Sequence, residues 1–127
     1  MDPQIRALFL SGNFIELKRS SFQAFTMLGK LDLSSNSISN LPKGCFEGLQ
    51  NVYELDLRKN RLERLEKNAF DGLTTLTKLY LDGNPLKEIK SGAFAGLNKI
   101  KSLNLSSMNI QVLGKSTFIG LKGLKEL

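Results

Sequence analysis

The chain has 127 residues, of which 41% are hydrophobic and 24% charged, and it carries a net charge of +6 at pH 7. This composition indicates one globular domain and excludes a disordered chain. The absence of histidine excludes Ser-His and Cys-His nucleophile pairs and histidine metal ligands, and no apolar run approaches the roughly 18 residues that a membrane span needs.

Similar segments recur along the whole chain. They begin near Ile5, Leu28, Val52, Leu76 and Ile100, and a sixth begins at Leu124. The first coil is 23 residues long, because one residue is missing between Ile15 and Leu17, and the others are 24. A fixed period of this length is typical of a solenoid, in which each coil packs on its neighbours. We therefore expect one repeat domain over residues 1–127.

Each coil contains leucines that alternate with other residues, which predicts a short β-strand. In chain order the strands centre on Leu8, Leu31, Leu55, Leu79 and Leu103. These leucines should point inward, and strands of successive coils should stack in parallel about 4.8 Å apart. The outward positions are then Ala7, Phe9, Lys30, Asp32, Glu54, Asp56, Lys78, Tyr80, Ser102 and Asn104.

Two further columns follow the strands. The first holds Asn13, Asn36, Asn60 and Asn84, whose amides should bond backbone groups that the inward turn leaves unpaired. Met108 takes the next place and is expected to fill it with the loss of one set of bonds; the alternative is a slip of one residue to Asn109. The second column, expected to form an apolar spine, holds Phe22, Phe46, Phe70, Phe94 and Phe118. The single cysteine, Cys45, precedes Phe46 and is expected to be a small buried filler.

Coil two, with Leu41–Pro42 and Phe46–Leu49, resembles the 24-residue repeat of extracellular leucine-rich repeat proteins, and the resemblance covers residues 5–127. It implies an α/β-type repeat solenoid. This is a right-handed leucine-rich repeat superhelix with a parallel β-sheet on the concave face and mostly loops and 3-10 turns on the convex face. The cysteine caps of this family are absent at both ends. That absence predicts a fragment of a longer extracellular ectodomain.

The irregularities of this chain, a short first coil and a Met in the asparagine column, resemble those of Toll-like receptors. Motifs such as LxLSSNxI and FxGLxxLKxL strengthen the resemblance. The resemblance implies the ligand-recognition segment of an innate immune receptor, with a protein, glycan or microbial ligand and with receptor dimerisation in the full-length parent. The basic residues are scattered among twelve acidic ones, so the net charge is only a weak signal for acidic partners such as glycans and no specific one for nucleic acid. No cofactor is expected. The alternatives are an extracellular matrix or neuronal adhesion protein, and an antigen binder like the variable lymphocyte receptors.

The concave face is the first candidate site, because aromatic and charged side chains at neighbouring positions suit protein or glycan recognition. Tyr80, Asp56 and Arg58 are expected to form a central patch. The candidate residues are Lys30, Asp32, Tyr53, Glu54, Asp56, Arg58, Lys78, Tyr80 and Asp82. For each of them, the alternative is a side chain that is merely solvated on the sheet surface.

A second candidate is the lateral face, represented by Arg61 and Arg64, where the alternative is a solvated ridge of mixed charges. Asn104, Leu105 and Ser106 form the only N-x-S/T sequence, so Asn104 is a candidate glycosylation site that would screen the concave face near coil five. Neither a metal-ligand spacing nor a phosphate-binding loop is recognisable, and the chain is not expected to be an enzyme.

Overall fold

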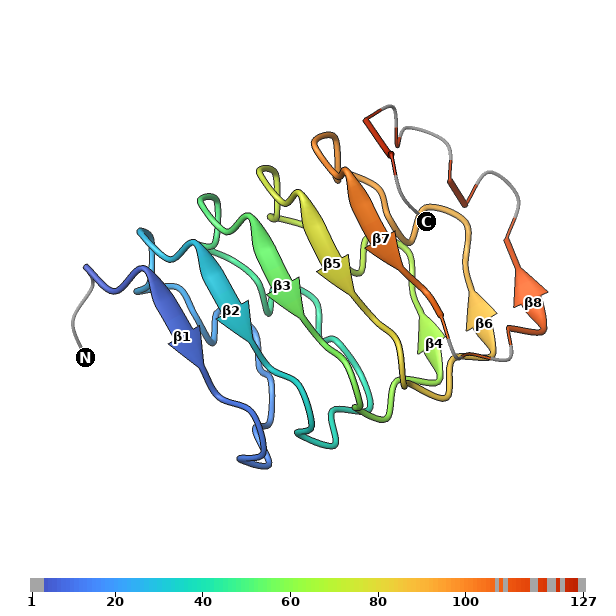
Figure 1. Cartoon of the computed structure of the whole chain (residues 1–127), viewed down its shortest axis with the longest axis horizontal. Helices are drawn as coiled ribbons and strands as arrows, with labels where there is room; N and C mark the ends of the chain where they lie inside the picture. The colour runs from blue at the N-terminus through green and yellow to red at the C-terminus, as the bar shows by residue number, and fades with distance from the viewer. Residues whose placement is uncertain are drawn as a thin grey trace.

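Leucines at alternate positions place one short strand of a parallel sheet in each coil. The computed structural model describes residues 4–106, 108, 110–114, 117–118, 121 and 123–125. Its five-stranded sheet has the order β1-β2-β3-β5-β7 (Figure 1). The strands are β1 (Ala7–Phe9), β2 (Lys30–Asp32), β3 (Glu54–Asp56), β5 (Lys78–Tyr80) and β7 (Ser102–Asn104). The predicted parallel sheet of a leucine-rich repeat solenoid is confirmed.

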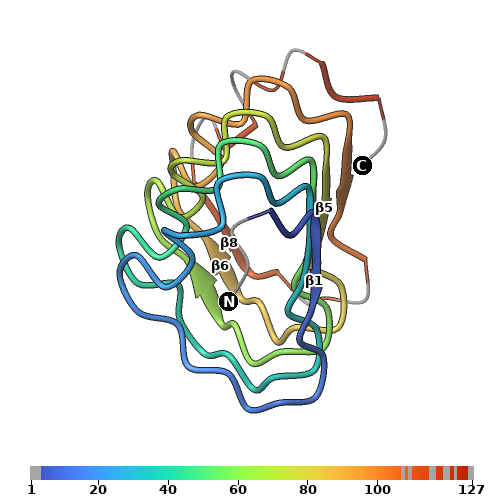
Figure 2. The same ribbon diagram turned by 90° about the vertical axis from the view of Figure 1, so that its left-hand side faces the viewer.

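The register follows the repeat. Leu8 pairs with Leu31, and then Leu31, Leu55, Leu79 and Leu103 pair in succession. Seen along the solenoid, the coils lie one behind another, with the five-stranded sheet along one side (Figure 2). The side chains of one column therefore lie next to one another on a continuous surface.

A second parallel sheet runs along the other side of the coils and was not predicted from the sequence. It consists of β4 (Arg64–Leu65), β6 (Glu88–Ile89) and β8 (Val112–Leu113), in the order β4-β6-β8. Strands of two residues are too short for alternation to reveal them. In the described part of the chain, the connecting segments between these strands contain turns and bends and no helix.

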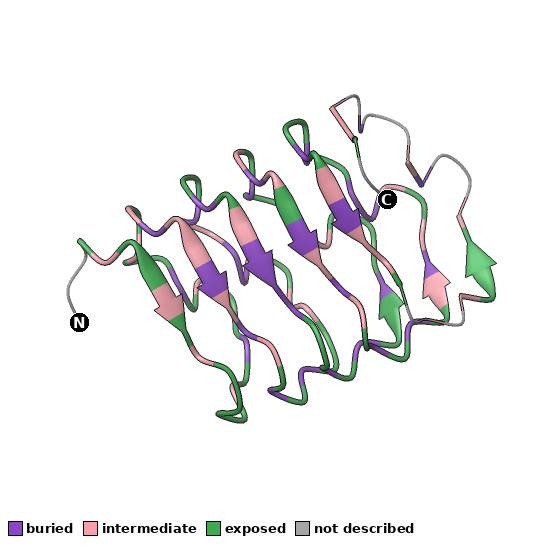
Figure 3. Cartoon of the chain, viewed as in Figure 1, coloured by how far each residue is buried: buried purple, intermediate pink, exposed green. Residues whose placement is uncertain are grey.

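The core lies between the two sheets. Leu31, Leu55, Leu79 and Leu103 are all buried, as the centres of the strands in Figure 3 show. Behind them Phe46, Phe70 and Phe94 stack with ring centroids 6.3 and 5.9 Å apart, and Phe118 continues the stack at 5.9 Å. The predicted spine is thus confirmed for these four. Phe22 is buried too, but its ring contact is with Phe25, at 6.5 Å.

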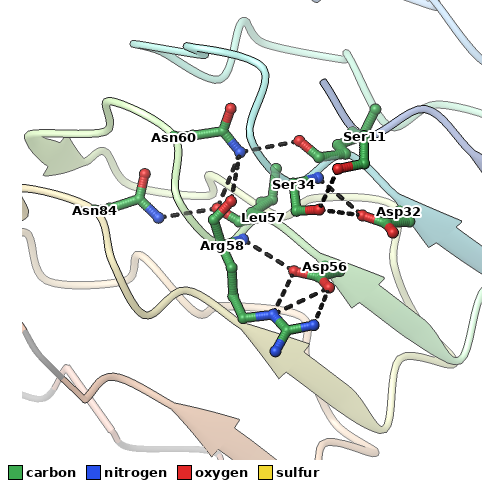
Figure 4. A network of polar contacts seen from close by, with 9 residues as sticks. Ser11, Asp32, Ser34, Asp56, Leu57, Arg58, Asn60 and Asn84 are labelled. Atoms are coloured by element: carbon green, nitrogen blue, oxygen red, sulfur yellow. Dashed lines mark hydrogen bonds and ion pairs between the residues drawn. The ribbon is translucent and has the colours of Figure 1, made fainter. Parts of the chain in front are cut away.

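The asparagine column joins the coils through buried hydrogen bonds. Asn60 Nδ2 donates to the carbonyl oxygens of Leu33 and Leu57, both at 3.0 Å, and Figure 4 labels Asn60 and Leu57. Its Oδ1 accepts from the backbone N–H groups of Asn36 and Ile38 at 2.9 and 3.0 Å. The predicted backbone bonding is confirmed, with the addition that the amides of Asn36, Asn60 and Asn84 each link two coils.

The two ends of this column differ from its middle. Asn13 is exposed, whereas Asn36 and Asn84 are buried like Asn60. Met108 is half-buried and packs against the core, as expected for a residue that fills the slot. Asn109, the alternative, lies outside the described residues.

Candidate functional site

The outward side chains of the five-stranded sheet form one surface, called the sheet face below. The alternation of the strands turns every second side chain away from the core, and the parallel register sets equivalent positions side by side. The sheet face corresponds to the surface predicted as concave. It consists of Ala7, Phe9, Lys30, Asp32, Ser34, Tyr53, Glu54, Asp56, Arg58, Lys78, Tyr80, Asp82, Ser102, Asn104 and Ser106.

Arg58 and Asp56 form the most strongly bonded pair on the sheet face. The Arg58 Nε donates to both oxygens of the Asp56 carboxylate at 3.0 and 3.1 Å, and Nη2 donates to Oδ2 at 2.6 Å (Figure 4). The backbone N–H of Arg58 also donates to Asp56 Oδ1 at 3.0 Å. Hydrogen bonding to Asp56 raises the pKa of the Arg58 guanidinium, so it stays charged. Asp56 is only 8% exposed and lies beneath the arginine rather than free on the surface.

Tyr80 completes the patch expected from the sequence. The guanidinium carbon of Arg58 lies 5.1 Å from the centroid of the Tyr80 ring, within the range of a cation–π contact. Tyr80 is the register neighbour of Asp56, one coil further on. The structure therefore brings Asp56, Arg58 and Tyr80 together, as predicted, although whether they bind a ligand stays a prediction.

Tyr53 and Lys30 form a second aromatic and basic pair. The Lys30 Nζ lies 5.9 Å from the centroid of the Tyr53 ring, and Tyr53 is 43% exposed. Gly29 makes room for this ring, because a Cβ at Gly29 would lie 2.8 Å from Tyr53 Cε1. The sequence prediction missed Gly29. The only signal in the sequence was that Gly29 holds the position in coil two that Tyr53 holds in coil three.

The remaining charges of the sheet face lie in rows. Lys30, Glu54 and Lys78 are register neighbours, so their charges alternate along the sheet. Opposite charges at such positions are mildly stabilising. Asp32 accepts hydrogen bonds from the N–H and hydroxyl of Ser34, at 2.9 and 2.7 Å.

Asp82 differs from the other acidic residues of this surface. Its Oδ1 is buried and has no hydrogen-bond partner among the described residues. The residue lies one coil beyond Arg58, and its carboxylate contributes to the raised pKa of that guanidinium. Asp82 is therefore part of the electrostatic surroundings of the central patch without bonding to it.

On the lateral face represented by Arg61 and Arg64, called the flank below, acidic residues of coil three pair with lysines of coil four. The Lys90 Nζ lies 2.8 Å from Glu66 Oε2, and the Lys87 Nζ lies 3.9 Å from Glu63 Oε1. The two predicted residues, Arg61 and Arg64, are both exposed and belong to neither pair. The flank is therefore partly the ridge of mixed charges named above as the alternative.

Asn104 lies on β7 with its side chain half-buried on the sheet face. Its Oδ1 accepts from the N–H and hydroxyl of Ser106 at 3.0 and 2.7 Å, so the first and third residues of the N-x-S sequence bond each other. Cys45 is buried as expected, and burial raises the pKa of its thiol to about 12.

Neither a metal centre nor an enclosed catalytic pocket emerges from the described residues. No three acidic or cysteine side chains there are grouped closely enough to hold a metal ion. The described chain also contains no helix long and apolar enough to span a membrane. Grooves of about 350 and 430 Å³ lie instead on the flank, near Arg64 and Lys67.

Comparison with known proteins agrees with the fold. A family model described as "Leucine rich repeat" matches residues 26–86 and 74–127. No relative among curated proteins matches the sequence. Among solved structures, the leucine-rich repeat domain of APL1B is similar with 28% identity and a TM-score of 0.75. The match covers 81% of this chain and 31% of that one.

A chain in the Toll–Spatzle complex, described as a hub in Drosophila development and innate immunity, is similar with 26% identity and a TM-score of 0.74. The match covers 80% of this chain but only 14% of that one, so this chain spans a minor part of either structure. Such solenoids typically serve as non-catalytic scaffolds for protein interaction. With the family model matching most of its length, the chain belongs to the leucine-rich repeat family, as a protein-interaction domain.

Proposed function

We propose that the chain is a ligand-recognition segment of a Toll-like innate immune receptor and that it binds a protein ligand through the sheet face. The similarity to a chain of the Toll–Spatzle complex supports the receptor assignment. The proposal includes an extracellular location, a glycosylated surface and a role in signalling carried out by other parts of the parent protein.

The observation that carries this proposal is the arrangement of Asp56, Arg58 and Tyr80. Three hydrogen bonds from the Arg58 side chain and a ring contact at 5.1 Å fix the guanidinium before any ligand arrives. A partner then loses little side-chain entropy when it contacts this group, which favours binding. Tyr53 adds exposed aromatic area in the same coil as Arg58, and tyrosine and arginine are among the residues most often important in protein interfaces.

A paired comparison of variants tests the sheet face. The chain is immobilised and exposed first to Spatzle, the partner in the similar structure, and then to conditioned medium from secreting cells. Bound proteins are identified and their affinities measured. The combined variant Tyr53→Ala and Tyr80→Ala should weaken binding at least tenfold, whereas Arg61→Ala, on the exposed flank, should change it less than twofold. A secreted partner that binds both variants equally would refute recognition by the sheet face.

A matrix or adhesion protein is the second candidate, because the similarity to the APL1B repeat domain is as high as that to the Toll complex. An antigen binder like the variable lymphocyte receptors would use the same surface. The parent protein separates these candidates: a transmembrane span followed by a cytoplasmic signalling domain supports the receptor, and a parent that lacks both overturns it.

A further inference from the structure

The second sheet stops inside the solenoid, at β4. On one side β4 pairs with β6, and the backbone N–H groups of Lys87 and Lys90 donate to Glu63 and Leu65 carbonyls at 2.8 and 3.0 Å. On the other side, residues 39–41 of coil two form no strand, and within the described chain no backbone hydrogen bond joins them to residues 63–66. Because alternate N–H groups of a parallel strand point to opposite sides, those of Arg64 and Glu66 point toward coil two.

Pro42 accounts for the irregular backbone of coil two. It occupies the position that Glu66 holds in coil three and Lys90 holds in coil four. In coil four this residue donates a backbone N–H to the sheet, at 3.0 Å from Leu65 O. Proline has no N–H to donate, so coil two cannot continue the ladder toward coil one. The segment before Pro42 therefore lacks a bond to coil one that would help to hold it in strand geometry. In the structure it does not pair with β4, which is left as an edge.

A groove opens beside this edge. One part, of about 350 Å³, is lined by residues that include Ser39, Leu41, Arg64 and Ala69. A second part, of about 430 Å³, shares Leu41 and Ala69 with the first and continues past Pro42. Leu41 and Ala69 are half-buried and pack against the core, so they provide an apolar floor. Each part is within the size range of pockets that bind ligands.

The charges of the groove favour an acidic occupant. Glu66 is paired with Lys90 at 2.8 Å, and Glu63 lies 3.9 Å from Lys87. Arg64 is exposed and makes no ion pair within the described residues, although Glu88 is its register neighbour on β6. Lys43 and Lys67, which line the second part of the groove together with Asp71, likewise form no ion pair among the described residues. The guanidinium of Arg64 is the cation beside β4 itself, and a carboxylate is the group that it binds best.

We propose that this groove binds an extended segment of a partner protein that carries an acidic side chain. The segment adds a strand to the free edge of β4, accepting hydrogen bonds from the N–H groups of Arg64 and Glu66, and its carboxylate pairs with Arg64. Main-chain bonds of this kind provide affinity in strand addition, and side-chain pairing provides specificity. The site lies on the flank, so it is separate from the sheet face proposed above.

The probe is a capped pentapeptide, acetyl-Thr-Val-Asp-Val-Thr-amide, added to the isotope-labelled chain and followed by NMR. We expect saturable shifts and slowed hydrogen exchange at the amides of Arg64 and Glu66. The same peptide with Lys in place of Asp should bind at least tenfold more weakly. A peptide whose backbone nitrogens are methylated should not slow exchange, because the methyl groups keep its backbone away from the edge of β4 although its carbonyl acceptors remain.

Two variants separate the groove from general surface charge. Arg64→Glu should weaken binding of the acidic peptide at least tenfold, while Arg61→Glu, with the same change of charge on the same flank, should weaken it less than twofold. Circular dichroism of both variants checks that they fold. The proposal is overturned by equal losses in the two variants, by shifts that map to the sheet face, or by no saturable binding at all.

Discussion

The guanidinium of Arg58 lies over the ring of Tyr80, 5.1 Å from its centroid, and connects two neighbouring coils across the sheet face. The same group bonds both oxygens of Asp56, which is almost fully covered. Asp56 is thus paired locally, while Arg58 and Tyr80 remain on the surface. This arrangement makes the two residues the part of the sheet face that is best fixed for contact.

Truncation of Arg58 should destabilise the chain through Asp56. Arg58→Ala leaves a nearly buried carboxylate with only the backbone N–H at 3.0 Å. Because the Arg58 side chain is 46% exposed, we expect a coupling between the two residues of only about 1 kcal/mol. A double-mutant cycle with Asp56→Ala, measured by urea unfolding, gives this value. A coupling near zero would show that the pair contributes nothing to stability.

Removal of one amide from the asparagine column should be much more costly. Asn60→Ala deletes bonds to the carbonyls of Leu33 and Leu57 and to two backbone N–H groups of coil two, all in the interior. Buried polar groups left without partners cost about 1–3 kcal/mol each, so we expect a loss of about 3 kcal/mol or more. Urea unfolding followed by circular dichroism measures it.

Asn13 provides the matched control for this experiment. It is exposed, and its Nδ2 bonds only carbonyls of its own coil, at 2.9 and 3.0 Å. Asn13→Ala should therefore cost less than about 1 kcal/mol. Equal losses in the two variants would mean that the bonds between coils add nothing to the local ones.

The phenylalanine spine offers a test that involves no polar group. Phe70 is fully buried and stacks on Phe46 and Phe94 at 6.3 and 5.9 Å. Phe70→Ala should lower the free energy of unfolding by about 3–5 kcal/mol, as is usual for a buried aromatic ring. Phe14, which is 83% exposed, is the control, and Phe14→Ala should change the free energy of unfolding by less than about 0.5 kcal/mol.

Burial of Cys45 makes stability depend on alkaline pH. Burial raises the pKa of this thiol from 9.0 to about 12, so the folded chain keeps its proton where the unfolded chain loses it. The contribution of the protonated thiol to the free energy of unfolding is complete below pH 9.0 and is lost as the pH rises toward 12. Between these two pKa values the free energy of unfolding falls by about 1.4 kcal/mol per pH unit, because the two states differ by one bound proton. Cys45→Ala should remove this part of the pH dependence, and identical profiles for both chains between pH 9 and 10.5 would contradict it.

The sequence predicted the parts of the fold that repeat. The leucine, asparagine and phenylalanine columns each recur with the period of the coil, so the parallel sheet and the links between coils could be recognised without coordinates. The second sheet could not, because two-residue strands such as β4 carry no periodic signal. That the second sheet ends at β4 depends on how closely coil two approaches coil three, and the identity of Pro42 alone does not determine this distance.

The candidate site was predictable in position but not in its bonding. Outward strand positions followed from alternation, and the proximity of Asp56, Arg58 and Tyr80 followed from the register. That Asp56 lies beneath Arg58 depends on one side-chain conformation, which the sequence does not contain. The space that Gly29 leaves for Tyr53 likewise depends on how two adjacent coils pack.

Glycosylation of Asn104 would test both the secretory route and the sheet face. Expression in secreting animal cells should give a glycan of the N-linked type, seen as a mass increase that Ser106→Ala abolishes. Because Asn104 lies on the outer side of β7, the glycan would cover coil five and leave Tyr53 and Arg58, two coils away, accessible. Partner binding to the sheet face should therefore differ less than threefold between the glycosylated chain and Ser106→Ala. A much larger gain on removing the glycan would place the contact at coil five, and an unmodified chain from secreting cells would contradict the modification itself.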